Sequence, residues 1–215
     1  LAYKPQLGLM LPLVLLASGR WRTFAAAAIT VVAMAAAVTA VLGVDVWRAF
    51  LASTAFTRHV LLEGGDPGWE KIQTVFAWVR LWGGSVPLAY GIQAATTLVM
   101  AVALIWLWRS AASFPAKAAA LAIAAVAAAP FSLDYDMTVS GIAVAFLAGA
   151  GRASGGAAWQ KTARAALWLV PLVARAAGNV HIPLGIVVML AAFAVTVLVR
   201  RHRRIDAESS AAPLS

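Results

Sequence analysis

The sequence predicts an all-α fold, a polytopic transmembrane helical bundle of about seven membrane segments. Hydrophobic residues make up 63% of the 215 residues and charged residues 12%, whereas soluble domains are about 45–50% apolar and about 25% charged. The mean hydropathy is +0.86, and a soluble domain of this size has too little interior to bury that much apolar surface. The apolar residues also gather in long uncharged stretches. These observations predict an integral membrane protein.

Membrane segments are expected where about 20 apolar residues follow one another, because a helix of that length spans about 30 Å of hydrocarbon. Three uncharged stretches reach or approach this length: Phe24–Gly43, Val86–Trp108 and Ile182–Val199. Four shorter apolar stretches are also predicted to be embedded: Leu7–Ala17, Ala118–Leu133, Met137–Gly151 and Ala165–Ala174, the last continuing past Arg175. Together they form one transmembrane domain over residues 1–204, and the polar segment 205–215 is predicted to be a disordered cytoplasmic tail.

The distribution of basic residues predicts the orientation of these segments. The formal net charge is +9, and in a membrane protein Lys and Arg mark cytoplasmic loops rather than a nucleic-acid surface. With seven alternating crossings and a cytoplasmic C-terminus, eleven of the 17 basic residues lie inside with two acidic ones. The outer side then holds six basic and six acidic residues. We therefore expect the membrane as a partner and no nucleic acid.

The outer loop, residues 44–85, is expected to contain two amphipathic helices in the membrane interface. Apolar residues recur at helical spacing over residues 47–60 and again over residues 69–79. A glycine-rich turn at 64–68 separates the two stripes. Tryptophans in both stripes favour an interfacial position. The two helices form either a cap over the bundle or the floor or lid of a lipid-facing active site.

The first candidate site residues are Asp134, Tyr135 and Asp136, in an acidic turn with the sequence SLDYD. Ionisable groups at membrane depth are costly, so a protein that keeps them there is expected to use them for its function. Sixteen residues lie between Lys117 and Asp134, about 24 Å as a helix, which is short of the membrane core. Two short spans that meet at a recessed turn, with Pro130 ending the first, would line a cavity. In the alternative, flanking basic side chains reach the interface and Asp136 only caps the next helix. Two aspartates are too few ligands for a divalent cation, so no metal site is predicted.

Basic and polar residues on the predicted outer face are the other candidates. Lys4 suits a phosphate as a compact positive charge, and Gln6 suits a sugar hydroxyl or a phosphate oxygen. Arg58, His59 and Lys71 lie in the outer loop, where they could hold a pyrophosphate or a lipid phosphate. The alternatives are an interfacial lysine at position 4 and solvated faces of interfacial helices for the loop residues.

Several chemistries are excluded by what the sequence lacks. There is no cysteine, so disulfides, thiolate nucleophiles and cysteine-ligated metals are excluded. The sequence also has no P-loop, no dinucleotide-binding glycine motif, no HExxH motif and no G-x-S-x-G motif. Nucleotide-dependent chemistry is therefore not expected, and no cofactor is predicted.

Three motifs occur in order along the chain: KPQLG at 4–8 followed by GRWR at 19–22, GWEKIQTVF at 68–76, and APFSLDYD at 129–136. Together they resemble the middle and C-terminal part of glycosyltransferase family 87, and the resemblance extends from Leu1 to about Val199. It implies a GT-C-like membrane hexosyltransferase. Such an enzyme takes a sugar, often mannose, from a polyprenyl-phosphate carrier. It passes that sugar to a lipid or glycan acceptor hydroxyl at the outer face of a bacterial plasma membrane.

The resemblance also implies roles for the candidate residues. The basic outer residues would meet the carrier phosphate, and the acidic turn would meet sugar or acceptor hydroxyls. GT-C enzymes usually carry their catalytic carboxylate in the first outer loop, so we expect the base upstream of Leu1 and expect this stretch alone to be inactive. Two other functions agree with the same polar residues: a lipid or polyprenyl-phosphate transporter and a non-catalytic membrane subunit.

Overall fold

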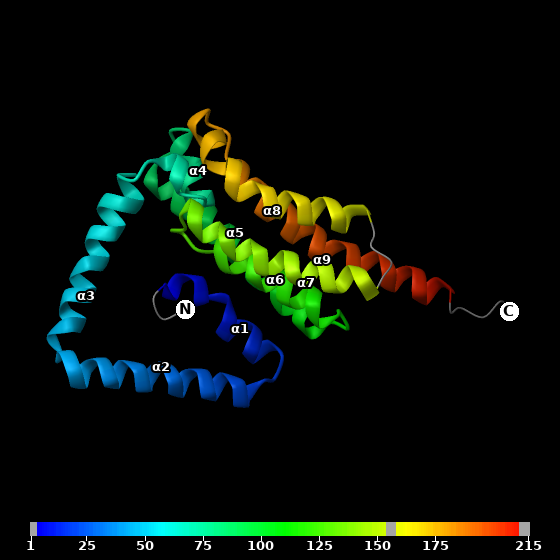
Figure 1. Cartoon of the computed structure of the whole chain (residues 1–215), viewed down its shortest axis with the longest axis horizontal. Helices are drawn as coiled ribbons and strands as arrows, with labels where there is room; N and C mark the ends of the chain where they lie inside the picture. Colours follow the sequence, from blue (N-terminus) through cyan, green and yellow to red (C-terminus); the bar gives the residue numbers. More distant parts are fainter. Residues whose placement is uncertain (1–3, 154–157, 211–215) are drawn as a thin grey trace.

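The computed structural model describes residues 4–153 and 158–210, with the side chains of residues 4–149 and 158–198 (Figure 1). The main helices are α1 (Met10–Ala17), α2 (Trp21–Leu42), α3 (Asp45–Phe56), α4 (Val75–Leu81), α5 (Val86–Arg109), α6 (Phe114–Ala127), α7 (Ser140–Ala153), α8 (Ala158–Asn179) and α9 (Leu184–Ser210). Short 3₁₀- or π-helical stretches accompany them: η1 (Pro5–Gly8), η2 (Thr57–Glu63), η3 (Trp69–Lys71) and η4 (Asp134–Val139). Within the described residues, the β structure is limited to one bridge between Ile72 and Leu133. The all-α prediction is confirmed.

Each of the seven predicted membrane segments coincides with a helix. Two of these helices, α2 and α5, are long and apolar enough to cross a membrane. Shorter apolar helices are Pro5–Ala17, Phe114–Ala127 and Leu184–Leu198. The number of crossings therefore stays a prediction. Helix α9 continues to Ser210, into the segment predicted to be a tail, and residues 211–215 lie outside the described part of the chain.

The helices on either side of the acidic turn are shorter than predicted. Helix α6 ends at Ala127 rather than at Leu133, and α7 begins at Ser140 rather than at Met137. Pro130 has no N–H and clashes with a preceding helical turn, so a helix cannot continue through it. The acidic turn therefore lies in an extended and 3₁₀-helical connection between two 14-residue helices.

Helix α6 is at the centre of the bundle. It packs against α1, α5, α7 and α9, and most of its alanines are buried. Small side chains let helix backbones approach closely, which is how helices associate where the surrounding solvent is itself apolar. Larger buried side chains from the neighbouring helices fill the remaining space: Met10, Leu104, Leu147 and Ile186.

A proline inside α8 is accommodated by a side chain of α7. Pro171 lies within the helix and cannot donate to the carbonyl of Leu167 four residues earlier. The buried hydroxyl of Ser140 donates to that carbonyl at 2.9 Å. In an apolar environment each backbone polar group needs a protein partner, so Ser140 replaces the hydrogen bond that the proline removes.

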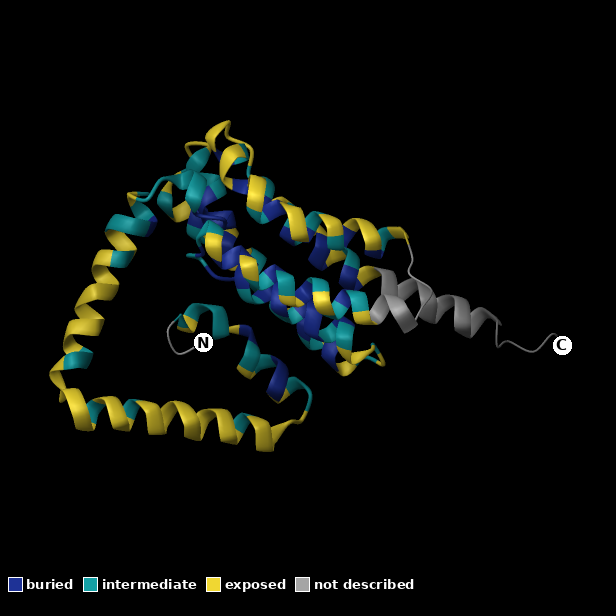
Figure 2. Cartoon of the chain, viewed as in Figure 1, coloured by how far each residue is buried: buried dark blue, intermediate teal, exposed yellow. Residues whose placement is uncertain are grey.

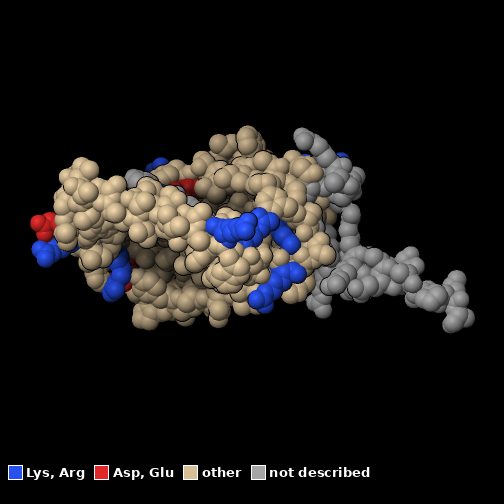
Figure 3. All heavy atoms as spheres, turned by 90° about the horizontal axis from the view of Figure 1, so that it is seen from below, with Lys and Arg blue, Asp and Glu red and all other residues tan. Residues whose placement is uncertain are grey.

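Helices α2 and α3 extend away from the bundle (Figures 1 and 2). Neither helix has a buried residue, and large apolar side chains of α3 such as Phe50, Leu51 and Phe56 are exposed. Figure 3 shows that the face carrying α2 is mostly uncharged. An apolar helix that contacts so little protein is suited to hydrocarbon, and α3 keeps the amphipathic character predicted for an interfacial helix.

The prediction of a second continuous amphipathic helix over residues 69–79 is wrong. Residues 69–71 form the short turn η3, residue 72 is extended, and α4 begins only at Val75. Ile72 and Phe76 are 3% and 0% exposed, so they pack on protein rather than on lipid. Helix α4 packs on α5, and η3 packs on α8. This part of the loop packs on the bundle as a cap, and the alternative role as the floor or lid of a lipid-facing active site stays a prediction.

Gln93 of α5 connects the cap to the end of α6. Its side-chain oxygen accepts the N–H of Phe76 at 3.0 Å, in the first turn of α4, where backbone donors have no helical partner. Its side-chain nitrogen lies 3.3 Å from the carbonyl oxygen of Ala128, which also accepts from Thr97 at 2.8 Å. Gln93 is 3% exposed, so one buried amide satisfies free backbone groups of two helices.

We expect Gln93→Leu to destabilise the protein by about 1–3 kcal/mol, because the N–H of Phe76 would be buried without a partner. Thermal unfolding of the detergent-solubilised protein measures the change. Thr96→Val on the exposed side of α5 is the matched control, since Thr96 bonds only within its own helix. Equal melting temperatures for the two variants would contradict this role of Gln93.

Candidate functional site

The acidic turn is held by the extended residues of the cap. Ile72 and Leu133 form an antiparallel bridge, and the N–H of Gln73 donates to the carbonyl of Ser132 at 2.8 Å. Ser132 is fully buried. Since Pro130 ends the helical path before this point, the chain is free to take the extended form that pairs with the cap. The pairing fixes where η4 begins and therefore where its carboxylates lie.

Lys4 and the acidic turn form one cluster. The ammonium of Lys4 is 2.6 Å and 2.9 Å from the two carboxylate oxygens of Asp136. It also donates to the Tyr135 hydroxyl at 3.2 Å and lies 4.3 Å from the centre of that ring. Asp136 is 7% exposed and accepts the N–H of Leu133 as well. Asp136 thus caps η4, not the following helix α7.

The charged state of Lys4 follows from these partners. Burial lowers the pKa of Lys4, but the hydrogen bonds to Asp136 and Tyr135 outweigh burial and raise the pKa above its ordinary value. Lys4 therefore carries its positive charge at physiological pH. The pair is neutral as a unit, and a phosphate would have to share this ammonium with Asp136.

Asp134, the other carboxylate of the turn, is more accessible. Its side chain is 24% exposed and lies 4.0 Å from the guanidinium of Arg175 in α8. Its other oxygen accepts the N–H of Tyr135 at 2.9 Å. Tyr135 itself is 57% exposed. Asp134, Tyr135 and Arg175 therefore form the solvent-facing side of the cluster.

A second charged cluster is centred on Glu63 at the end of η2. Its carboxylate accepts from Arg58 at 3.1 Å, lies 2.8 Å from the imidazole of His59, and accepts from the Tyr90 hydroxyl of α5 at 3.0 Å. The hydrogen bond from His59 lowers the pKa of Glu63, and Tyr90 and Arg58 act in the same direction against the opposing effect of burial. Arg58 and His59, which were predicted to hold a phosphate together with Lys71, both contact the carboxylate of Glu63 in this structure.

An apolar groove begins beside this second cluster. It has a volume of about 520 Å³ and lies between α1 and α5, with the end of α6 as its third wall. The residues that line it are apolar, except for Tyr90, Gln93 and Thr97. Tyr90 belongs to both features, since its ring lines the groove and its hydroxyl bonds Glu63. Leu9 and Pro130 in the groove walls lie a few residues from Lys4 and Asp134 in the chain.

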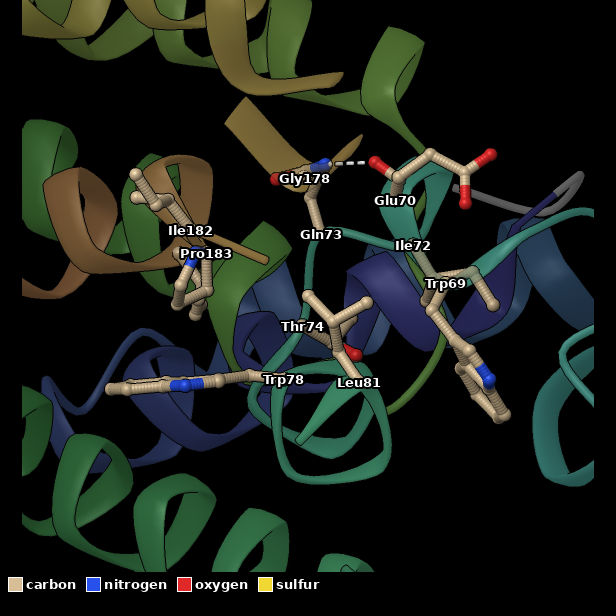
Figure 4. A pocket seen from close by; sticks show the side chains of 11 residues that line it. Trp69, Glu70, Ile72, Gln73, Thr74, Trp78, Leu81, Gly178, Ile182 and Pro183 are labelled. Carbon is tan, nitrogen blue, oxygen red and sulfur yellow. Dashed lines mark hydrogen bonds between the residues drawn. The ribbon is translucent and has the colours of Figure 1, made fainter. Parts of the chain in front are cut away.

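A smaller cavity between the cap and α8–α9 is too small for a sugar (Figure 4). Trp69, Gln73, Trp78 and Gly178 are among its lining residues, and its volume is about 10 Å³. That is close to the space needed for one water molecule. The side-chain amide of Gln73 donates to the carbonyl of Glu70 at 2.7 Å, as the dashed line shows. We assign this cavity to packing of the cap.

The remaining candidates lie outside both clusters. Gln6 is half-buried in η1, and Lys71 is half-buried at the end of η3. Neither side chain makes a hydrogen bond or ion pair with another described residue. Among the described residues no group of three or more His, Asp or Glu side chains could hold a metal ion.

Three residues of the clusters were not among the sequence candidates: Glu63, Tyr90 and Arg175. Glu63 follows His59 by four residues, a spacing at which side chains on a helix meet. That local signal was available in the sequence. Tyr90 and Arg175 reach their partners across long sequence separations, and no local pattern reports such contacts.

Two of the described helices are long and apolar enough to cross a membrane, and an apolar groove of about 520 Å³ lies beside the charged cluster on Glu63. The model of glycosyltransferase family 87 matches residues 1–133, more than half of the chain. The chain therefore belongs to glycosyltransferase family 87. The match includes Lys4 and the loop 44–85, and it ends directly before Asp134. No curated protein and no solved structure matches the chain.

We expect the Lys4–Asp136 pair to show strong coupling in a double-mutant cycle. Lys4→Met leaves the buried carboxylate of Asp136 without its partner, and Asp136→Asn does the same to the half-buried ammonium of Lys4, and both are costly. The double variant removes both charges, so its loss of stability should be smaller than the sum by about 0.5–3 kcal/mol. Unfolding in detergent provides the four free energies, and strictly additive losses would contradict the pairing.

The Glu63 cluster predicts a pH dependence of stability. A carboxylate whose pKa is lower in the folded state stabilises the fold above its ordinary value of 4.5, and this contribution disappears as the pH falls through the lowered pKa. The difference in melting temperature between wild type and Glu63→Gln should thus shrink as the pH falls below about 4.5. Asp66→Asn, at an exposed acidic residue nearby, is the control. A difference that grows on acidification would contradict the sign.

Proposed function

We propose that this protein transfers a hexose, such as mannose, from a polyprenyl-phosphate carrier to an acceptor hydroxyl at the outer face of the plasma membrane. Family membership supports glycosyl transfer. The observation that supports a lipid-linked donor is the direct connection, through Tyr90, between an apolar groove of about 520 Å³ and a charged cluster. A polyprenyl phosphate has the same two parts, a long hydrocarbon chain and an anionic head.

The reaction needs one bond to form and one to break. The acceptor oxygen attacks the anomeric carbon of the sugar, and the bond between that carbon and the phosphate oxygen breaks. The polyprenyl phosphate leaves with the bonding electrons, and the proton of the acceptor hydroxyl passes to a base. Transfer of this kind inverts the anomeric centre.

Residues of this chain are assigned binding and positioning roles. The two oxygens of Asp136 are engaged by Lys4 and by the N–H of Leu133, so Asp136 is poorly placed to accept a proton. Asp134 is accessible and can accept hydrogen bonds from sugar or acceptor hydroxyls. Arg175 and Arg58 offer guanidinium groups that suit phosphate oxygens. The general base of the reaction is not assigned to any residue between Lys4 and Ser210.

The proposal is tested with the full-length protein in lipid nanodiscs and a panel of radiolabelled polyprenyl-phosphate hexoses. Glycosyl transfer moves label from the carrier to an acceptor and releases one polyprenyl phosphate for each sugar transferred. Absence of transfer with every donor and acceptor would contradict the proposal. Movement of intact carrier between leaflets of proteoliposomes, without change to either lipid, would show a transporter instead.

We expect Asp134→Asn to reduce the rate of transfer by at least tenfold while expression and melting temperature stay close to wild type, because the side chain is partly exposed. Asp66→Asn makes the same chemical change at an exposed outer-loop position and should keep wild-type transfer. Comparison of initial rates for the two full-length variants measures the effect. Wild-type rates for Asp134→Asn would remove Asp134 from the substrate site.

A further inference from the structure

A basic pocket lies at the opposite end of the bundle from the acidic turn, where α1 leads into α2 and α5 leads into α6. Its volume is about 500 Å³, and its charged lining residues are Arg20, Arg109 and Lys117. None of the described residues that line it is acidic. Figure 3 shows basic side chains gathered around the start of α2. The proposed transfer reaction uses none of these residues.

Aromatic side chains fix the position of Arg20 in this pocket. Its guanidinium lies 5.9 Å from the ring centre of Trp108 and 5.8 Å from that of Phe114, distances at which a cation is attracted by an aromatic face. The two rings pack edge to face at 6.3 Å. Trp108 is only 8% exposed, and its indole N–H has no acceptor among the described residues. A buried donor without an acceptor is costly and calls for a ligand or another explanation.

The positive charge of the pocket is only partly used by the protein itself. Lys117 donates to the carbonyls of Trp108 and Ser110 at 3.0 and 2.7 Å, so it caps the end of α5. Arg20 and Arg109 take part in none of the ion pairs between described residues. The N-termini of α2 and α6 lie at the same place, and helix N-termini favour anions.

The surroundings of the pocket are apolar. Trp106 and Phe114 are about half exposed, and Arg109 also lines a neighbouring hollow with Val102, Ile105 and Trp106. The uncovered, uncharged apolar length of α2 starts at Phe24, one helical turn after Arg20. A ligand in this position would therefore meet cations at its head and hydrocarbon-like surface beside its tail.

We propose that this pocket binds the phosphate head of an anionic phospholipid, on the membrane side opposite the acidic turn. Arg20 and Arg109 contact the phosphate oxygens, and Lys117 adds a third positive charge. The acyl chains lie along α2 and the exposed aromatic residues of α5 and α6. Basic residues at the predicted cytoplasmic face are common in membrane proteins. Here they line a pocket with an aromatic wall, which distinguishes a specific site from general attraction.

The test uses the full-length protein in nanodiscs of phosphatidylcholine with increasing phosphatidylglycerol, and counts retained lipid by native mass spectrometry. We expect wild type to retain phosphatidylglycerol selectively. The variant Arg20→Gln/Arg109→Gln should bind it roughly tenfold or more weakly, since each basic residue contributes to attraction of an anionic lipid. Lys161→Gln in α8, an exposed basic residue outside the pocket, should behave as wild type.

A second readout separates the lipid from a free anion. Added phosphatidylglycerol should raise the melting temperature of wild type and of Lys161→Gln but not that of Arg20→Gln/Arg109→Gln. Inorganic phosphate at the same concentration should not raise it. Equal lipid retention by all three proteins would overturn the site, because it would show attraction without a specific pocket. Stabilisation by inorganic phosphate to the same extent would overturn the assignment to a lipid.

Discussion

The pairing of the cap with the acidic turn is the constraint that organises one end of this protein. The bridge between Ile72 and Leu133 and the hydrogen bond from Gln73 to Ser132 join two segments about 60 residues apart. Because the backbone of 132–133 is fixed by this pairing, η4 starts at a defined point and presents its carboxylates toward η1 and α8. The break at Pro130 makes the pairing available, since a continuing helix would have turned these backbone groups inward.

Charge compensation is the second requirement at this end. Asp136 is nearly buried and is tolerated there because Lys4 and a backbone N–H engage both of its oxygens; a buried carboxylate without such partners would be strongly unfavourable. Glu63 is compensated in the same way by Arg58, His59 and Tyr90. The protein thus carries two neutralised clusters with an apolar groove adjoining one of them. In the proposed function, a hydrocarbon chain in this groove would meet no uncompensated charge of these two clusters.

The sequence predicted the helical class and the location of the seven apolar helices, because uncharged runs of that length report burial in protein or lipid directly. It also predicted the break at Pro130 and placed Lys4 on the same predicted face as Asp134, but it did not predict the direct pairing of Lys4 with Asp136. It did not predict that Ile72 leaves the helical stripe, since its spacing fits a helix and only the distant partner Leu133 makes the extended form favourable. The contacts of Tyr90 and Arg175 could not be predicted from the sequence for the same reason, because they depend on tertiary packing and not on the local periodicity of apolar residues.

Covalent capture of the donor tests the central claim most directly, namely that the groove beside Tyr90 and the two charged clusters form a binding site for a polyprenyl phosphate. The full-length protein is irradiated with a polyprenyl-phosphate sugar that carries a photoreactive group in its first isoprene units, and the labelled peptides are sequenced. The account predicts labels on residues of α1 and α5 that line the groove, such as Leu13, Leu98 and Ala101, and their loss when unlabelled carrier is added. Labelling confined to other helices, or labelling that unlabelled carrier does not reduce, would contradict the account.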